Sequence, residues 1–255
     1  MTVAEGTIPM PEQRDEFGQH FSNQFNHELA NLRSRVFAMG GVVEQQIADA
    51  VAALVARDEV LARSVIAEDL YVNALEIYLD EECRRILARR QPAAGDLRLI
   101  FAVIKTVTDI ERIGDSAKGV ARMALQIIAG EPRGPIPRLQ RLGALARDMV
   151  QMAINAFWRM DVNLALSVAR ADLEVDAEYR SIMDELAELM TDDPGATPWA
   201  LNLVWAARAL ERAGDHAKNI AEYLIFLVQG MDVRHVSIED RERQVQRQMT
   251  GSTGS

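Results

Sequence analysis

The segment that decides the fold is ERIGDSAKGVA at residues 111–121, because it returns 100 residues later as ERAGDHAKNIA at residues 211–221. Seven of these 11 positions are identical. A second pair of segments, residues 61–74 and 164–177, shares eight of 14 positions at an offset of 103. A period near 100 residues is longer than a solenoid unit of roughly 20 to 50 residues, so we predict a duplicated domain.

Each copy has the pattern of three amphipathic helices. Apolar residues recur three or four positions apart, which is the spacing of a helix that buries one face. Breaks rich in Pro or Gly separate the stretches, most clearly at residues 132–137. Asp96 is a good N-cap residue for the third helix. The predicted helices span residues 21–57, 61–90, 96–130, the stretch that ends near 159, 162–190 and 198–229.

These patterns predict an all-α protein with no strand. Short connectors within each copy favour antiparallel neighbours, so the six long helices should form two tandem three-helix bundles. The predicted organisation is a mobile leader at 1–20, a first bundle at 21–131, a second bundle at 132–231 and a C-terminal tail at 232–255.

Composition narrows the class of protein. The 255 residues are 49% hydrophobic, which is enough for a sizeable core. A net charge of −10 argues against nonspecific binding of nucleic acid through a basic face. Cys83 is the only cysteine and cannot form an internal disulfide, so we expect a buried thiol and a reducing compartment. The chain has neither an apolar signal core nor a long uncharged apolar run, which predicts a cytoplasmic protein.

Glycines lie inside several of the predicted helices. Gly114 and Gly214 occupy equivalent positions, although each costs about 1 kcal/mol of helix stability relative to alanine. We therefore expect another group to approach the backbone closely at both points. Gly40 and Gly41 are expected to permit close helix packing or a slight bend.

Two acidic pairs carry the candidate chemistry. Glu111 and Asp115 lie four residues apart on one helical face, as do Glu211 and Asp215. Like charges at this spacing repel, and a bound cation would turn the repulsion into coordination. The preceding helix of each copy adds carboxylates that an antiparallel neighbour could bring to the same ridge: Asp69 with Glu76, and Asp172 with Asp176.

The same ridges also have the pattern of a solvated, ion-paired helix face, which needs no ligand. The duplication keeps the metal hypothesis open beside this one, because a solvated ridge has no physical need to repeat the same residues beside a costly glycine. His216 aligns with Ser116 of the first copy. A lone histidine of this kind is more often structural or exposed than a metal ligand. Neither copy has the Glu-x-x-His spacing of di-iron bundle enzymes.

Several motifs together resemble the PhoU family. They are QPAAGDLR at 91–98 with ERIGD at 111–115, the second ERAGDHAKNIAE at 211–222, QFNHEL at 24–29, MGGVVEQQ at 39–46 and DVRH at 232–235. The resemblance covers about residues 21–236 and implies two similar three-helix bundles side by side.

The resemblance also implies a regulatory role without catalysis. PhoU-like proteins restrain the phosphate-starvation response and link the ATPase subunit of the phosphate ABC transporter to a membrane sensor histidine kinase. It further implies a homodimer, at most peripheral membrane contact, and metal such as Mg, Mn, Zn or Fe. Carried over, the metal residues are Glu111, Asp115, Glu211 and Asp215, with Asp69, Asp172 and Asp176 as further contributors.

Departures from the repeat predict unequal sites, and two alternative functions stay open. Asp109 corresponds to Ala209, and Asn73 corresponds to Asp176, so the two metal sites are expected to differ in ligand number. A metal-dependent carboxylate-bundle enzyme would show turnover that depends on Glu111 or Asp115. A generic helical scaffold would tolerate the loss of these acids without effect.

Overall fold

The computed structural model describes residues 13–92, 94–130, 133–134 and 136–230, with side chains from residue 25 onward. Within these ranges it contains six long α-helices, one 3-10 turn and no strand, which confirms the all-α prediction. The elements are α1 (Gln13–Ala56), α2 (Glu59–Arg90), α3 (Ala94–Ala129), α4 (Pro137–Arg159), α5 (Val162–Asp192), the 3-10 turn (Pro194–Ala196) and α6 (Thr197–Gln229).

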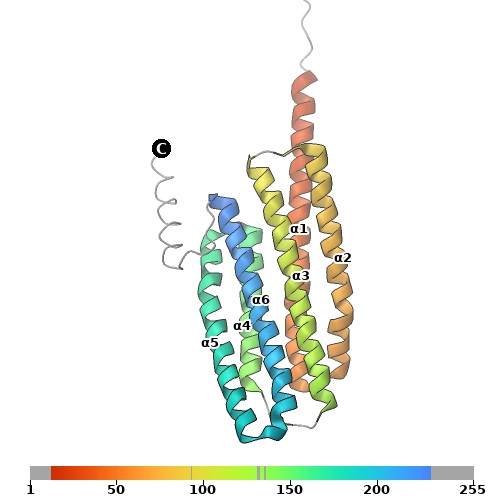
Figure 1. Ribbon diagram of the computed structural model, residues 1–255. Helices are drawn as coiled ribbons and strands as arrows, with labels where there is room; N and C mark the ends of the chain where they lie inside the picture. Colours follow the sequence, from red (N-terminus) through yellow and green to blue (C-terminus); the bar gives the residue numbers. More distant parts are fainter. Residues whose placement is uncertain (1–12, 93, 131–132, 135, 231–255) are drawn as a thin grey trace, which may run out of the picture.

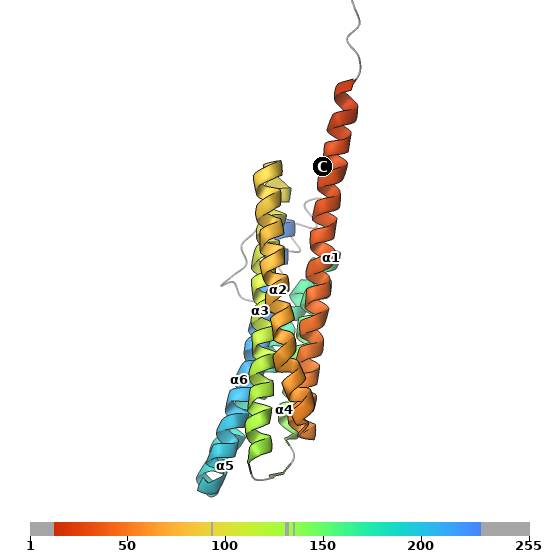
Figure 2. The ribbon, with the colours of Figure 1, turned by 90° about the vertical axis from the view of Figure 1, so that its right-hand side faces the viewer.

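The helices form two antiparallel bundles, α1–α3 and α4–α6, that lie side by side (Figures 1 and 2). The bundles meet through two helix pairs, α3 with α6 and α1 with α4. Helices α2 and α5 pack on helices of their own bundle and lie at opposite edges of the molecule (Figure 1). The apolar faces of all six helices contribute to one continuous core.

The duplication extends to the helix starts. Asp58 caps α2 by accepting a hydrogen bond from the backbone N–H of Leu61 at 3.0 Å, and Asp161 caps α5 in the same way through Leu164 at 3.0 Å. The apolar period stops and restarts near residue 58 because α1 ends and α2 begins there, and Asp58 caps the new helix.

Close approach of backbones joins α1 to α4. A Cβ built on Gly40 would lie 2.6 Å from Ile154 Cδ1, and one built on Gly143 would lie 2.5 Å from Val51 Cγ2. Gly143 and Ile154 are the repeats of Gly40 and Val51 at the offset of 103, so one contact is made twice, once from each bundle. Close packing at Gly40 is thereby confirmed, whereas the neighbouring Gly41 faces open space.

Several predicted helix boundaries differ from the structure, and two of the differences change an interpretation. Helix α1 begins at Gln13, within the expected leader. The sequence did not predict this start, because residues 13–20 carry no apolar period. Helix α3 begins at Ala94, so Asp96 lies in its first turn, where its charge complements the helix dipole, and does not cap it. The rest of the leader and the predicted tail at 232–255 lie outside the described residues.

Candidate functional site

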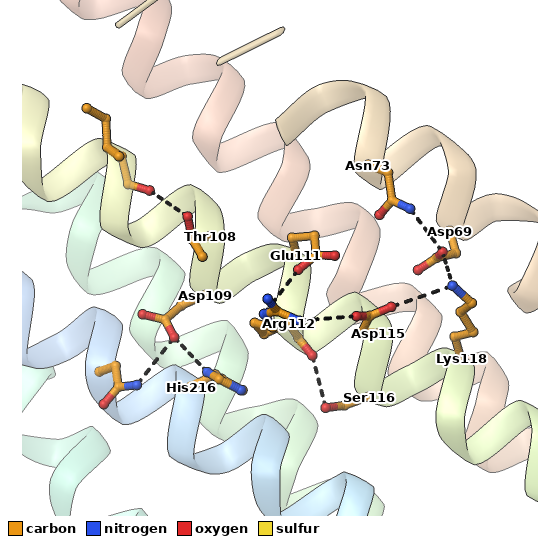
Figure 3. Close-up of polar contacts among 12 residues, drawn as sticks. Asp69, Asn73, Thr108, Asp109, Glu111, Arg112, Asp115, Ser116, Lys118 and His216 are labelled. Atoms are coloured by element: carbon orange, nitrogen blue, oxygen red, sulfur yellow. Dashed lines mark hydrogen bonds and ion pairs between the residues drawn. The ribbon is translucent and has the colours of Figure 1, made fainter. Parts of the chain in front are cut away.

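A buried carboxylate meets a lysine in each bundle. Asp69 of α2 accepts a hydrogen bond from Lys118 Nζ of α3 at 2.5 Å, and the carboxylate is only 1% exposed (Figure 3). In the second bundle Lys218 of α6 pairs with Asp172 of α5, which is 4% exposed. Two predicted metal ligands therefore already form an ion pair with a lysine of the same chain.

The first acidic cluster lies beside the Asp69–Lys118 pair. It combines Glu111 and Asp115 of α3 with Glu76 of α2. Burial raises the pKa of Glu111, and the negative charges of Asp115, Glu76 and Asp69 raise it further. The pKa of Glu76 is also raised, first by burial and then by the negative charges of Asp80 and Asp115.

Basic side chains border this first cluster. Arg112 lies 3.5 Å from Glu111 and 3.7 Å from Asp115, and Lys118 Nζ lies 3.5 Å from Asp115 (Figure 3). The basic groups next to the cluster are therefore the exposed guanidinium of Arg112 and the ammonium of Lys118, which also pairs with Asp69. Arg112 lowers the pKa of Glu111, but burial and the neighbouring carboxylates outweigh it, so the net shift is upward.

The second cluster repeats this arrangement in α5 and α6. Burial raises the pKa of Glu211, and Asp215 and Asp176 add to the increase. The pKa of Asp215 is also raised, first by burial and then by Asp172 and Asp176. Arg208 lies 2.6 Å from Glu211 on the exposed side.

All seven residues predicted for metal thus gather in two clusters, one in each bundle. Glu76 lies near Glu111 in the first bundle, and Asp176 lies near Glu211 in the second. Asn73 donates a hydrogen bond to Asp69 at 3.3 Å.

The clusters fit a metal ion only in part. Among the described residues, no three acidic, histidine or cysteine side chains converge closely enough to coordinate one ion. In favour of a cation, Asp69 Oδ1 and Glu211 Oε2 are buried and accept no hydrogen bond. Asp69 and Asp172 already pair with lysines, which argues against a metal ion at these two carboxylates. The pairs Glu111 with Asp115 and Glu211 with Asp215 remain the better ligands.

The duplicated glycines have a packing explanation. A Cβ on Gly114 would lie 3.3 Å from Val72 of α2, and a Cβ on Gly214 would lie 3.3 Å from Val175 of α5. Close approach is confirmed, and the approaching group is a core valine in both bundles. The cost of the glycines therefore does not by itself indicate a ligand.

A polar contact between the bundles was missed at the level of sequence. Asp109 of α3 lies 2.6 Å from His216 Nδ1 of α6 and accepts a hydrogen bond from Asn219 at 3.3 Å (Figure 3). At the symmetry-related place, a Cβ on Gly119 would lie 3.6 Å from Ala209. The available signal was that Asp109 and His216 each break the repeat, in opposite copies, within crossing helices.

The remaining reactive side chain is inert in this fold. Cys83 is a free and fully buried thiol in the first bundle, as expected. Burial raises its pKa to about 12, so the nucleophilic thiolate is disfavoured.

None of the described helices is both long and apolar enough to cross a bilayer.

The comparison with protein families matches the PhoU domain twice, at residues 36–124 and 139–224. The chain belongs to the PhoU domain family. The two matched segments fall in the two bundles, so each bundle is one PhoU domain. The family resemblance drawn from the motifs is thereby confirmed.

Named relatives cover nearly the whole PhoU chain. A phosphate-specific transport system accessory protein PhoU homolog of Pseudomonas aeruginosa is 50% identical over 235 residues, which cover 91% of this chain and 97% of the relative. The accessory protein PhoU of Escherichia coli is 40% identical over 225 residues, covering 88% and 93%.

Solved PhoU structures share the fold. The crystal structure of PhoU from Pseudomonas aeruginosa superposes with a TM-score of 0.78 at 51% identity, covering 81% of this chain and 100% of that one. The phosphate transport system regulatory protein PhoU from Streptococcus pneumoniae gives 0.77 at 29% identity, covering 82% and 99%. The prediction of two PhoU-like three-helix bundles is confirmed.

Proposed function

We propose that this PhoU chain is a cytoplasmic, non-enzymatic regulator that restrains phosphate uptake and the phosphate-starvation response when phosphate is plentiful. The observation that supports this role is the 50% identity, across both bundles, to a protein named as a phosphate transport accessory protein. The chain acts by contact, as a homodimer. It couples the ATPase subunit of the phosphate ABC transporter to a membrane sensor histidine kinase and reaches the membrane only through these partners.

A starvation reporter tests the regulatory role. Alkaline phosphatase would be measured in abundant phosphate in a strain that lacks the gene for this chain. We expect high expression in the deleted strain and low expression once the gene is restored. Low expression in the deleted strain would contradict the role.

Metal binding by the acidic pairs is the second part of the proposal. Glu111 with Asp115, and Glu211 with Asp215, would hold a divalent or iron-type cation such as Mg, Mn, Zn or Fe. The support is electrostatic: burial and mutual repulsion raise the pKa of Glu111, Glu211 and Asp215, and a cation would relieve both effects. When bound, the ion would neutralise charge and link two successive turns of α3 or α6.

Titration with Mn²⁺ by calorimetry distinguishes a cation site from a solvated ridge. We expect binding in the wild-type chain that Asp115→Asn and Asp215→Asn each weaken, whereas the exposed control Asp148→Asn leaves it unchanged. Absence of Mn²⁺ and Fe²⁺ binding in the wild type would reject the cation and leave the ion-paired ridge. Turnover that Asp115→Asn abolishes would instead favour the carboxylate-bundle enzyme.

A further inference from the structure

An apolar stripe runs along the outward face of α2. Leu70 and Ile77 are 73% and 67% exposed, although both are large aliphatic side chains. Ala67 and Ala74, which are also exposed, alternate with them at steps of three and four residues. This is the spacing of a coiled-coil seam, and it lies opposite the face that α2 buries in its own bundle.

The second bundle has no such stripe. At the offset of 103, Ala67 and Ile77 correspond to Arg170 and Arg180 on α5, while Leu70 and Ala74 remain Leu173 and Ala177. Because the same three-helix bundle forms with arginines at these places, the fold does not require an apolar outer face. The α2 seam is therefore better explained by an external contact.

Charged pairs lie at both ends of the seam. Arg63 lies 2.7 Å from Glu59 near the start of α2, and Arg84 lies 3.5 Å from Glu81 towards its end. All four side chains are more than half exposed. The order of charges is acid before base at both ends, so a second α2 in the antiparallel direction presents opposite charges. A parallel copy would set each charge against its own kind.

We propose that the α2 seam is the contact surface for a second copy of this chain, with the two α2 helices antiparallel about a two-fold axis that crosses the seam midway between Leu70 and Ala74. This surface deepens the homodimer of the proposed function and rests on it. In this register Ala67 opposes Ile77 of the second copy and Leu70 opposes Ala74, so that small residues receive large ones. The same register sets Arg63 against Glu81.

The alternative heptad registers are worse. A shift of one heptad in one direction sets Leu70 against Glu81, which buries a charge without a partner. A shift in the other direction sets Arg63 against Ala74 and leaves Glu81 outside the contact. Size and charge complementarity therefore select the same register independently.

A pair of engineered cysteines tests the surface and the register together. In the variant A67C/I77C the two cysteines lie about 15 Å apart along one helix, too far to join within a chain. We expect mild oxidation of the full-length variant to give a covalent dimer through two disulfides. The matched control on α5, R170C/R180C, should stay uncrosslinked at the same concentration.

Sedimentation velocity separates the dimer from its surface. We expect the wild-type chain to be dimeric, and Leu70→Glu to raise the dimer dissociation constant at least about 100-fold, because each dimer would bury two unpaired charges. The equivalent Leu173→Glu on α5 should leave the constant unchanged. A reversal of charge, R63E, should weaken the dimer, and R63E/E81R should restore it.

Two results would overturn the proposal in different ways. A wild-type chain that stays monomeric at every concentration tested would reject the homodimer, and leave the starvation reporter to judge the regulatory role. A dimer that persists in Leu70→Glu, with no crosslink in A67C/I77C, would keep the homodimer and reject the α2 surface. Circular dichroism confirms that each variant remains helical.

Discussion

The first bundle presents an apolar outer helix, α2, whereas the equivalent helix of the second bundle, α5, carries arginines at two of the same positions. Inside, the two bundles repeat one another: the aspartate caps, the glycine contacts and the aspartate–lysine pairs occur in both. The duplicated chain therefore keeps these three contacts in both bundles and differs on the outer face of α2 and α5.

Among the differences between the two interiors, one concerns a buried polar group of α1 that lies near Gly114 of α3. Gln46 of α1 is 1% exposed, and its amide nitrogen and oxygen have no hydrogen-bond partner. Its equivalent in α4 is Met149, which is fully buried and apolar. The first bundle thus holds an unsatisfied polar group where the second has a methionine, a difference that lowers the stability of the first.

The largest expected effect comes from the buried lysine pairs. Lys118→Met should cost about 3 kcal/mol of unfolding free energy, because it removes the cationic partner of the buried Asp69 carboxylate. Lys218→Met should cost less, since the Lys218 side chain is 31% exposed compared with 19% for Lys118. Urea unfolding followed by circular dichroism measures both. Equal losses would show that the two pairs are equivalent.

Larger side chains at the glycine contacts should weaken the packing between the two bundles. Gly40→Val or Gly143→Val should each lower the unfolding free energy by about 2 kcal/mol, because the added atoms would overlap Ile154 or Val51. Thermal unfolding provides the measurement. Gly41→Val is the matched control, and a loss as large as that of Gly40→Val would refute the close contact.

Gln46→Met should make the first bundle resemble the second. Removing an unsatisfied buried amide should raise the unfolding free energy by about 1 kcal/mol. The reverse change, Met149→Gln, should lower it by a similar or larger amount. Both variants would be compared with the wild type in urea, and a destabilising Gln46→Met would mean that the amide has a partner in solution.

The smallest expected effect concerns pH. The pKa values of Glu111 and Glu211 are raised above the ordinary 4.5, so their contribution to stability is full below pH 4.5 and is lost as pH rises through the raised values. The variant E111Q/E211Q should therefore exceed the wild type in stability at neutral pH and match it near pH 4.5. Thermal unfolding across pH tests this against the exposed control E174Q, which should follow the wild type.

Much of this fold could be predicted because the apolar period and the repeat are local in sequence. Helices α2 to α6 follow from the spacing of apolar residues. Antiparallel packing made a gathering of the acids possible, but the sequence alone could not establish it. The lysine partners of Asp69 and Asp172 could not be predicted, because contacts between helices depend on rotation about each helix axis. The start of α1 at Gln13 was missed for lack of apolar periodicity, and the bridge from Asp109 to His216 depends on how the bundles dock.

The central claim is that this PhoU chain restrains phosphate uptake, and labelled phosphate tests it most directly. Initial uptake would be measured in abundant phosphate, in a strain that lacks the gene and in the same strain with the gene restored. We expect uptake to rise in the deleted strain and to return to the original rate when the gene is restored. Uptake that is the same in both strains would contradict the claim.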